Sequence, residues 1–202
     1  MGPPSDTKRP GRPRDETIDE EIVSSLFELI EEVGLGAVTI DAIAERAGVG
    51  KATIYRRWQS KEDLIVDAVA GLINVPELDE SSDIRQVLLS GLQGIHSFMS
   101  ESTAGLVFPW LVAEVARGSE VGKRYSEAVI APRRAAVAAQ IEGAVKRGEL
   151  RADLDVELAV DMFTGPVIIR KMITGRQAVT ADRWAENLVD YLLNGWGPPA
   201  TE

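Results

Sequence analysis

Residues 51–61 are rich in side chains that donate hydrogen bonds to anions. The basic and hydroxyl side chains of this stretch, apart from Ser60, are Lys51, Thr53, Tyr55, Arg56, Arg57 and Lys61. Such groups bind phosphates and the edges of bases, and an arginine can contact guanine through two parallel hydrogen bonds. The same charges would also suit a solvated helix face, so the elements that present them must decide between the two interpretations.

Two short helices joined by a tight turn are predicted around this cluster. The first covers about residues 40–47, and Gly48 follows it because glycine accepts the left-handed backbone conformation of a tight turn. The second covers about residues 51–58, where Ile54 and Trp58 lie one turn apart and face the core. This is the plan of a helix-turn-helix, whose second helix enters the major groove of DNA.

The stretch of residues 39–61 resembles the DNA-binding domain of TetR-family regulators. The matching positions are Thr39, Ile43-Ala44, Ala47-Gly48-Val49, Thr53-Ile54-Tyr55, Trp58 and Ser60-Lys61. Trp58 stands where the family more usually has phenylalanine, and it still supplies a buried aromatic ring. The resemblance implies an all-α protein of about nine helices. An N-terminal three-helix domain with the helix-turn-helix would precede a helical ligand-binding and dimerisation domain.

The resemblance also assigns roles inside the helix-turn-helix, residue by residue. Phosphate contacts are expected from Thr39, Thr53, Tyr55 and Lys61. Base edges would be reached from Lys51, Ala52 and Arg56. For Arg57 a base and a phosphate both stay open. Lys61 would be helped by the positive end of the helix that begins there.

Residues 1–14 form a basic arm that we expect to be flexible, since it lacks apolar anchors. The arm carries Arg9, Arg12 and Arg14, with a Gly-Arg-Pro segment like the core of an AT-hook. An extended segment of this kind can place arginine in an A·T-rich minor groove. A disordered solubilising tail is the alternative.

The net charge of −10 argues at first against a nucleic-acid partner. Its distribution matters more, because the basic residues cluster in the arm and in the helix-turn-helix and leave an acidic body elsewhere. One histidine and no cysteine exclude most nucleophile–base and metal arrangements, so we expect no enzyme, no metal and no cofactor. The alternative, a helical protein that binds no DNA, is disfavoured by the intact cluster of basic residues in the helix-turn-helix. Without a leader or a long apolar run, a cytoplasmic protein with no membrane partner is expected.

Helical periodicity continues through the rest of the chain. It predicts helices near residues 84–100, 103–117, 120–147, 154–174 and 180–194. In the N-terminal part, a capping-box spacing between Thr17 and Glu20 predicts that the first helix starts near Thr17. The expected organisation is an arm (1–14), a DNA-binding domain (15–61), a connecting helix (62–76), a ligand-binding and dimerisation domain (77–197) and a tail (198–202).

The middle helices are expected to enclose an effector cavity. Methionine and aromatic side chains suit an adaptable apolar pocket, although at helical spacing they suit a plain core as well. The candidates are His96, Phe98, Met99, Phe108, Trp110, Tyr125, Met162 and Phe163. The effector is then an unidentified small molecule, mainly apolar.

The last two helices pair across a two-fold axis in the family, which implies a homodimer here. The candidate interface residues are Val160, Val167, Ile168, Leu188, Tyr191, Leu192 and Trp196, with intramolecular core as the alternative. A dimer presents two recognition helices to the two half-sites of a palindromic operator. The resulting expectation is a ligand-responsive repressor of double-stranded operator DNA, with activation left open.

Overall fold

The computed structural model describes residues 14–72, 83–100, 102–173 and 183–196, with the side chains of 14–16 left out. Over these ranges the chain is helical without a strand, as expected. When the continuous helix over 120–146 is taken as one, the described residues form nine helices, the number expected from the sequence. None of these helices is both long and apolar enough to cross a membrane.

The chain divides into two compact units, Met1–Ile65 and Val66–Glu202. The boundary falls inside the segment that the sequence predicts as a connecting helix. The helices of the first unit are α1 (Arg14–Val33), α2 (Ile40–Arg46), α3 (Lys51–Tyr55) and the start of α4 (Lys61–Gly71). Its core is built from Ile22, Leu26, Ile43, Ile54, Leu64 and Ile65, none of which is exposed.

The start of α1 differs from the prediction. The helix begins at Arg14, so Thr17 lies inside it and cannot cap it, and the predicted capping box is wrong. Helix α1 ends at Val33, where Gly34 takes a φ of +77° and its amide bonds back to the Ile30 carbonyl at 3.0 Å.

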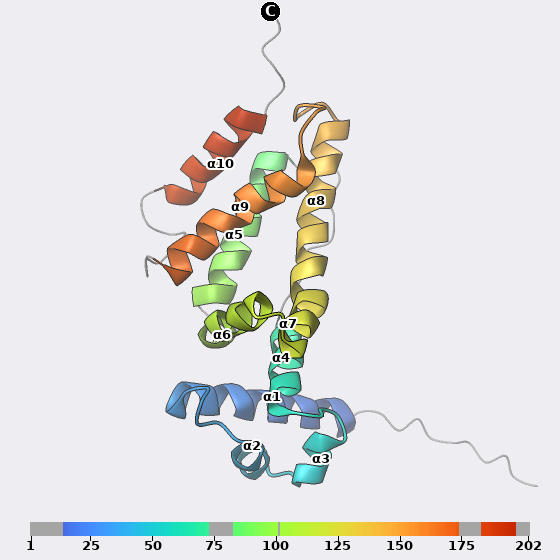
Figure 1. Cartoon of the computed structure of the whole chain (residues 1–202), viewed down its shortest axis with the longest axis vertical. Coiled ribbons are helices and arrows are strands. Elements are labelled where there is room, and N and C mark those ends of the chain that lie inside the picture. The colour runs from blue at the N-terminus through green and yellow to red at the C-terminus, as the bar shows by residue number, and fades with distance from the viewer. Residues whose placement is uncertain (1–13, 73–82, 101, 174–182, 197–202) are drawn as a thin grey trace, which may run out of the picture. The chain divides into compact units, whose positions relative to one another are not determined.

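The second unit contains the remaining helices. They are α5 (Ile84–Ser100), α6 (Ala104–Ala116), α7 (Glu120–Tyr125), the π-helical turn η1 (Ser126–Ile130), α8 (Ala131–Lys146), α9 (Val156–Met172) and α10 (Trp184–Trp196). Helices α5, α6 and α9 begin and end within two residues of their predicted ranges, and α7, η1 and α8 together fill the single helix predicted over 120–147. The predicted start of the last helix, near residue 180, lies outside the described residues. Helix α5 packs against α6, α8, α9 and α10, and α9 crosses it between α8 and α10 (Figure 1).

Helix α9 lies close to α5 at one particular point. A Cβ atom on Gly91 of α5 would lie 3.1 Å from Cζ of Phe163 on α9. The Phe163 ring, 1% exposed, therefore packs directly on the α5 backbone. Phe163 thus belongs to the core of this unit.

The segment 120–146 is one uninterrupted helix with a π turn in its middle. Pro132 explains the turn, because a proline inside a helix has no amide hydrogen and its ring clashes with the carbonyl four residues earlier. Just before Pro132 the backbone changes from i→i+4 to i→i+5 hydrogen bonds, and the amide of Ala131 donates to the carbonyl of Ser126. The sequence predicts a kink or a first turn at Pro132, and the widened turn is how the helix accommodates it.

Candidate DNA interface and effector residues

The helix-turn-helix is held by short backbone and capping hydrogen bonds. The hydroxyl of Thr39 caps α2 by accepting from the amide of Ala42 at 3.2 Å. In the turn, Gly48 adopts a φ of +65°, and the amide of Val49 donates to the Ala44 carbonyl at 3.0 Å. Helix α3 then starts from Gly50. This tight turn fixes the angle at which α3 leaves α2.

Helix α3 is anchored on one side and open on the other. Ile54 is fully buried and Trp58 is 7% exposed, so both face the core as the spacing predicts. The outward residues are Lys51, Ala52, Tyr55 and Arg56, all exposed, together with the half-buried Thr53. The structure thus brings the predicted base-reading residues and Tyr55 onto one accessible surface, which we call the α3 face. Thr39, at the start of α2, is exposed as well.

Arg57 is oriented differently from the residues of the α3 face. Its Nε pairs with Oδ1 of Asp19 on α1, and its side chain is only 15% exposed. A second nitrogen, Nη1, donates to the Thr53 carbonyl at 3.4 Å. Arg57 therefore joins the end of α3 to α1, a role that the sequence does not reveal because Asp19 lies far away in the chain.

Lys61, expected at a phosphate, also makes contacts inside the protein. Its Nζ donates to the carbonyl of Val38 at 2.9 Å and to that of Leu35 at 3.4 Å. These bonds hold the segment that leads into α2 against the start of α4. An ammonium group has three donors, so one donor is left for a phosphate.

Two ion pairs support α2 from the outside. Arg46 forms a forked pair with Glu32 of α1, with distances of 2.7 and 2.6 Å, and this hydrogen bond lowers the pKa of the Glu32 carboxyl. Lys51 Nζ lies 2.6 Å from Oδ2 of Asp41, and both side chains are more than half exposed. Exposed pairs are weak and screened by salt, so a DNA phosphate can replace Asp41 as the partner of Lys51.

The arm is only partly within the described residues. Arg9 and Arg12 lie outside them, and Arg14 is the first residue of α1, with its side chain not described. Minor-groove contact by the arm therefore stays a prediction.

Most of the candidate pocket residues are buried in the second unit. His96, Phe98, Met99, Phe108, Tyr125 and Phe163 are at most 8% exposed. Trp110 is half-buried, and Met162 is 44% exposed. Phe98 and Phe108 meet edge to face with ring centroids 6.4 Å apart. A surface hollow of about 530 Å³ lies elsewhere, beside Ile84, Leu150 and Leu193, and none of the candidates lines it.

The candidate interface residues fall into two groups. Val160, Val167, Leu192 and Trp196 are at most 6% exposed and pack within the protomer, whereas Ile168 and Leu188 are half-buried and Tyr191 is 74% exposed. A second set of apolar residues, on α9 and its C-cap, was not among the interface candidates, although Met162 was a pocket candidate. Leu158, Met162, Ile169 and Ile173 are between 44% and 74% exposed, and their spacing of four, seven and four residues places them on one side of the helix. We call these four residues the α9 stripe.

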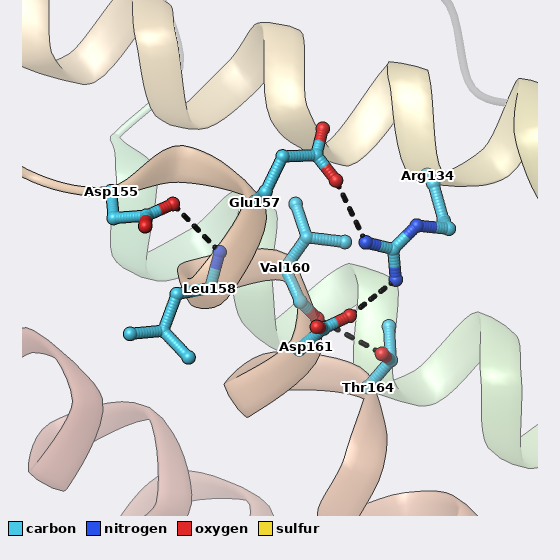
Figure 2. A network of polar contacts seen from close by, with 7 residues as sticks. All are labelled: Arg134, Asp155, Glu157, Leu158, Val160, Asp161 and Thr164. Atoms are coloured by element: carbon cyan, nitrogen blue, oxygen red, sulfur yellow. Dashed lines mark hydrogen bonds and ion pairs between the residues drawn. The ribbon is translucent and has the colours of Figure 1, made fainter.

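A polar network fixes the orientation of α9 (Figure 2). The guanidinium of Arg134 on α8 reaches Asp161 at 2.6 Å and Glu157 at 2.9 Å, one helical turn apart. Asp155 caps α9 by accepting from the amide of Leu158 at 3.0 Å. In Figure 2 the Leu158 side chain points away from Arg134, so the network locks α9 with the α9 stripe turned outward.

Family models match both parts of the chain. The model described as bacterial regulatory proteins, tetR family, matches residues 22–68. The model described as tetracyclin repressor-like, C-terminal domain, matches residues 78–192.

Individual relatives and solved structures agree with these matches. The HTH-type transcriptional regulator YdeS of Bacillus subtilis is 33% identical over 92% of each chain. The HTH-type transcriptional repressor KstR2 of Rhodococcus jostii is 28% identical over 98% of this chain and 97% of the relative. Among solved structures, the TetR family transcription regulator SCO0332 has a TM-score of 0.68 at 28% identity, covering 90% of this chain and 99% of its own. FadR from Bacillus subtilis, solved with stearoyl-CoA, has a TM-score of 0.69 at 19% identity, covering 87% and 98%, a likeness of fold.

Proposed function

The chain belongs to the TetR family of transcriptional regulators, and from this we propose that it is a repressor released from its operator by a small effector. It is a DNA-binding regulator and not an enzyme. In the proposed form, a homodimer binds a palindromic operator in the cytoplasm and leaves it when a mainly apolar molecule binds the second unit. The observation that carries the DNA-binding part is the α3 face, with Lys51, Tyr55 and Arg56 turned outward.

The α9 stripe supports the dimer. One α3 helix contacts few base pairs, so useful specificity needs two half-sites and a two-fold axis. Four large apolar side chains along one side of α9 and its C-cap are exposed, as is Tyr191 on α10, and exposed apolar side chains of this kind are what protein partners cover. We assign the centre of the interface to the α9 stripe and Tyr191, and give the buried Val160, Val167, Leu192 and Trp196 a supporting role from within each protomer.

Release by an effector is supported by the way α4 is attached. Its first residue, Lys61, bonds to the loop before α2, and Asp67, six residues later, pairs with Arg124 of α7 at 2.7 Å. A ligand acts on DNA binding only by stabilising one arrangement more than another. A movement of α7 would act on Asp67, and α4 is the segment of chain that leads from Asp67 back to the helix-turn-helix.

The test is operator binding by the full-length protein, with DNA from upstream of its own gene as the probe. Titration at several salt concentrations should show tight binding that weakens steeply with salt, and sedimentation should show a dimer on the DNA. A reporter driven by the same DNA separates repression from activation. Failure to bind any DNA more tightly than random sequence would contradict the proposed function.

Arg56→Ala sharpens this test. If Arg56 reads a base edge, the variant should lose roughly 1–3 kcal/mol of operator affinity and accept other bases at one position of each half-site. Arg151→Ala is the matched control, because Arg151 is exposed on the loop after α8 and pairs with Asp153 at 2.6 Å. Selection of binding sites from randomised DNA reads out the preference, and an unchanged preference would exclude base reading by Arg56.

A further inference from the structure

Two arginines of the second unit, Arg133 and Arg170, have their guanidinium groups over an aromatic ring within the described residues, and Arg133 is the one on α8. It lies near the start of α8, and its guanidinium carbon is 4.9 Å from the centre of the Phe98 ring on α5. Its side chain is half-buried, and burial lowers the pKa of the guanidinium. Throughout the part of the chain that the structure describes, no carboxylate pairs with Arg133.

The neighbouring arginines on the same continuous helix all have acidic partners. Arg124 pairs with Asp67 at 2.7 Å, and Arg134 holds Glu157 and Asp161. Just past the helix, Arg147 pairs with Glu149 at 2.6 Å. A chain with this many acidic residues supplies counter-ions readily, yet Arg133 faces an aromatic ring instead. A partly desolvated cation without a counter-ion is costly, unless a bound anion completes the site.

The π turn brings a second polar group toward this cation. Tyr125 and Arg133 are eight residues apart, which in a regular α-helix leaves them about 80° apart around the axis. A turn with i→i+5 hydrogen bonds contains one residue more than an α-helical turn, and η1 lies between Tyr125 and Arg133. The two residues are therefore separated by about two full turns, as residues seven apart are in a regular α-helix. Tyr125 is 2% exposed, and the positive charge of Arg133 opposes the rise that burial causes in the pKa of its hydroxyl. The phenol and the guanidinium thus share one side of the helix.

The ring under Arg133 belongs to an aromatic pair. Phe98, which Arg133 stacks on, meets Phe108 of α6 edge to face. A single cation over the Phe98 ring, which in turn contacts Phe108, matches a molecule with one negative charge and an apolar body. A planar carboxylate fits the fork of the guanidinium through two parallel hydrogen bonds, whereas a phosphate dianion would call for a second cation, and the nearby Arg124 and Arg134 are already paired.

The geometry points to Arg133 as the group that binds the carboxylate of a hydrophobic monocarboxylic acid, with Phe98, Phe108 and Tyr125 against the apolar body and rim of the ligand. This inference rests on the proposed effector-released function and names the chemical class of the effector. The carboxylate of the acid would replace the Phe98 ring as the main partner of the guanidinium, or it would bind the edge of the guanidinium while the ring stays in place.

The experiment measures binding to the full-length protein by titration calorimetry. The probes are decanoate, hexadecanoate and phenylacetate, each paired with its uncharged primary amide. At least one acid should bind with one site per protomer, and its amide at least tenfold more weakly. In Arg133→Gln the affinity for that acid should fall roughly 10- to 100-fold, as expected for loss of a charged hydrogen bond. Arg133→Lys, which keeps the charge but not the fork, should lie between.

Arg151→Gln is the control, since it removes an equal charge from an exposed loop arginine of the same unit and should leave acid binding unchanged. The acid-to-amide ratio in the unaltered protein keeps the test valid if Arg133→Gln does not fold. Absence of binding by all three acids, equal binding of acids and amides, or full acid affinity in folded Arg133→Gln would each overturn the inference. Operator binding without probe, measured on the same samples, separates this result from the proposed function, because loss of DNA binding alone contradicts only the latter.

Discussion

Lys61 Nζ, at the first residue of α4, donates a hydrogen bond of 2.9 Å to the carbonyl oxygen of Val38, just before α2. The bond crosses from the end of the helix-turn-helix back to its beginning. It fixes where α2, and with it α3, stands on the first unit. Lys61 is therefore a structural residue of the DNA-binding unit, and a phosphate contact would be an additional role.

We predict that Lys61→Ala lowers the free energy of unfolding by about 1–2 kcal/mol, because two carbonyl groups lose a charged donor. It should also reduce the salt dependence of operator binding by about one unit in slope per protomer, if the third donor meets a phosphate. Urea unfolding and salt titrations measure the two effects separately. Lys123→Ala is the control, since Lys123 pairs only along its own helix with Glu120. Unchanged unfolding in Lys61→Ala would show that the carbonyl contacts contribute nothing to stability.

The pair between Arg57 and Asp19 leads to a second prediction. Arg57→Ala should lower the free energy of unfolding by about 1–3 kcal/mol, because the Oδ1 atom of Asp19, which is covered although the side chain is 41% exposed, loses its partner. Arg56→Ala, on the exposed side of the same helix, should leave stability nearly unchanged. Asp19→Asn combined with Arg57→Ala should cost less than the sum of the two. If Arg57→Ala is fully stable but changes base preference, Arg57 reads DNA instead.

The helices were largely predictable from the sequence, because apolar residues recur at helical spacing and glycines mark the breaks. The ranges predicted for α5 and α6 match those observed closely. The start of α1 was missed because Arg14 to Glu16 carry no apolar residue to continue the pattern. The π turn was not predictable in form, since Pro132 removes a hydrogen bond but the sequence does not say whether the helix bends, breaks or widens there.

For the candidate sites, the sequence identified surfaces better than contacts. The α3 face was predictable because Ile54 and Trp58 define its buried side. The partners of Arg57 and Lys61 were not, because one is a distant carboxylate and the other a backbone carbonyl. On α9 the amino-acid sequence alone does not distinguish buried from exposed apolar residues. Only the packing shows that Val160 and Val167 are fully covered while Ile169 is 55% exposed.

The exposed α9 stripe gives a direct test of the dimer. Ile169→Glu should convert the dimer to monomers, because two carboxylates would be brought together and desolvated at the centre of the interface. Operator affinity should fall steeply as the second half-site is lost. Leu106→Glu is a close control, since Leu106 is a similarly exposed apolar residue, at 56%, on α6. Analytical ultracentrifugation measures the change, and a dimer of Ile169→Glu as tight as the unaltered protein would place the interface elsewhere.

Tyr125 should make stability depend on alkaline pH. Burial raises the pKa of its hydroxyl from the usual 10.0 to about 12 in the folded protein. The unfolded chain then releases this proton at lower pH than the folded one. The contribution of Tyr125 is complete below about pH 10 and is lost as the pH rises from about 10 to about 12. Over that range the unaltered protein should lose about 2–3 kcal/mol that Tyr125→Phe does not lose.

Urea unfolding at fixed protein concentration, at intervals from about pH 9 to about pH 11.5, measures this difference, and a fixed concentration is needed because a dimer is more stable when more concentrated. Lysines that titrate in the same range are common to both proteins and cancel in the comparison. Tyr191→Phe serves as the control, because Tyr191 is 74% exposed. Loss of its hydroxyl should leave the dependence of stability on pH the same as in the unaltered protein. Parallel profiles for Tyr125→Phe and the unaltered protein would mean that the phenol ionises as easily in the folded state as in the unfolded one. The hydroxyl of Tyr125 would then have access to water. The inference that Tyr125 lies in apolar surroundings beside the effector's carboxylate would then be wrong.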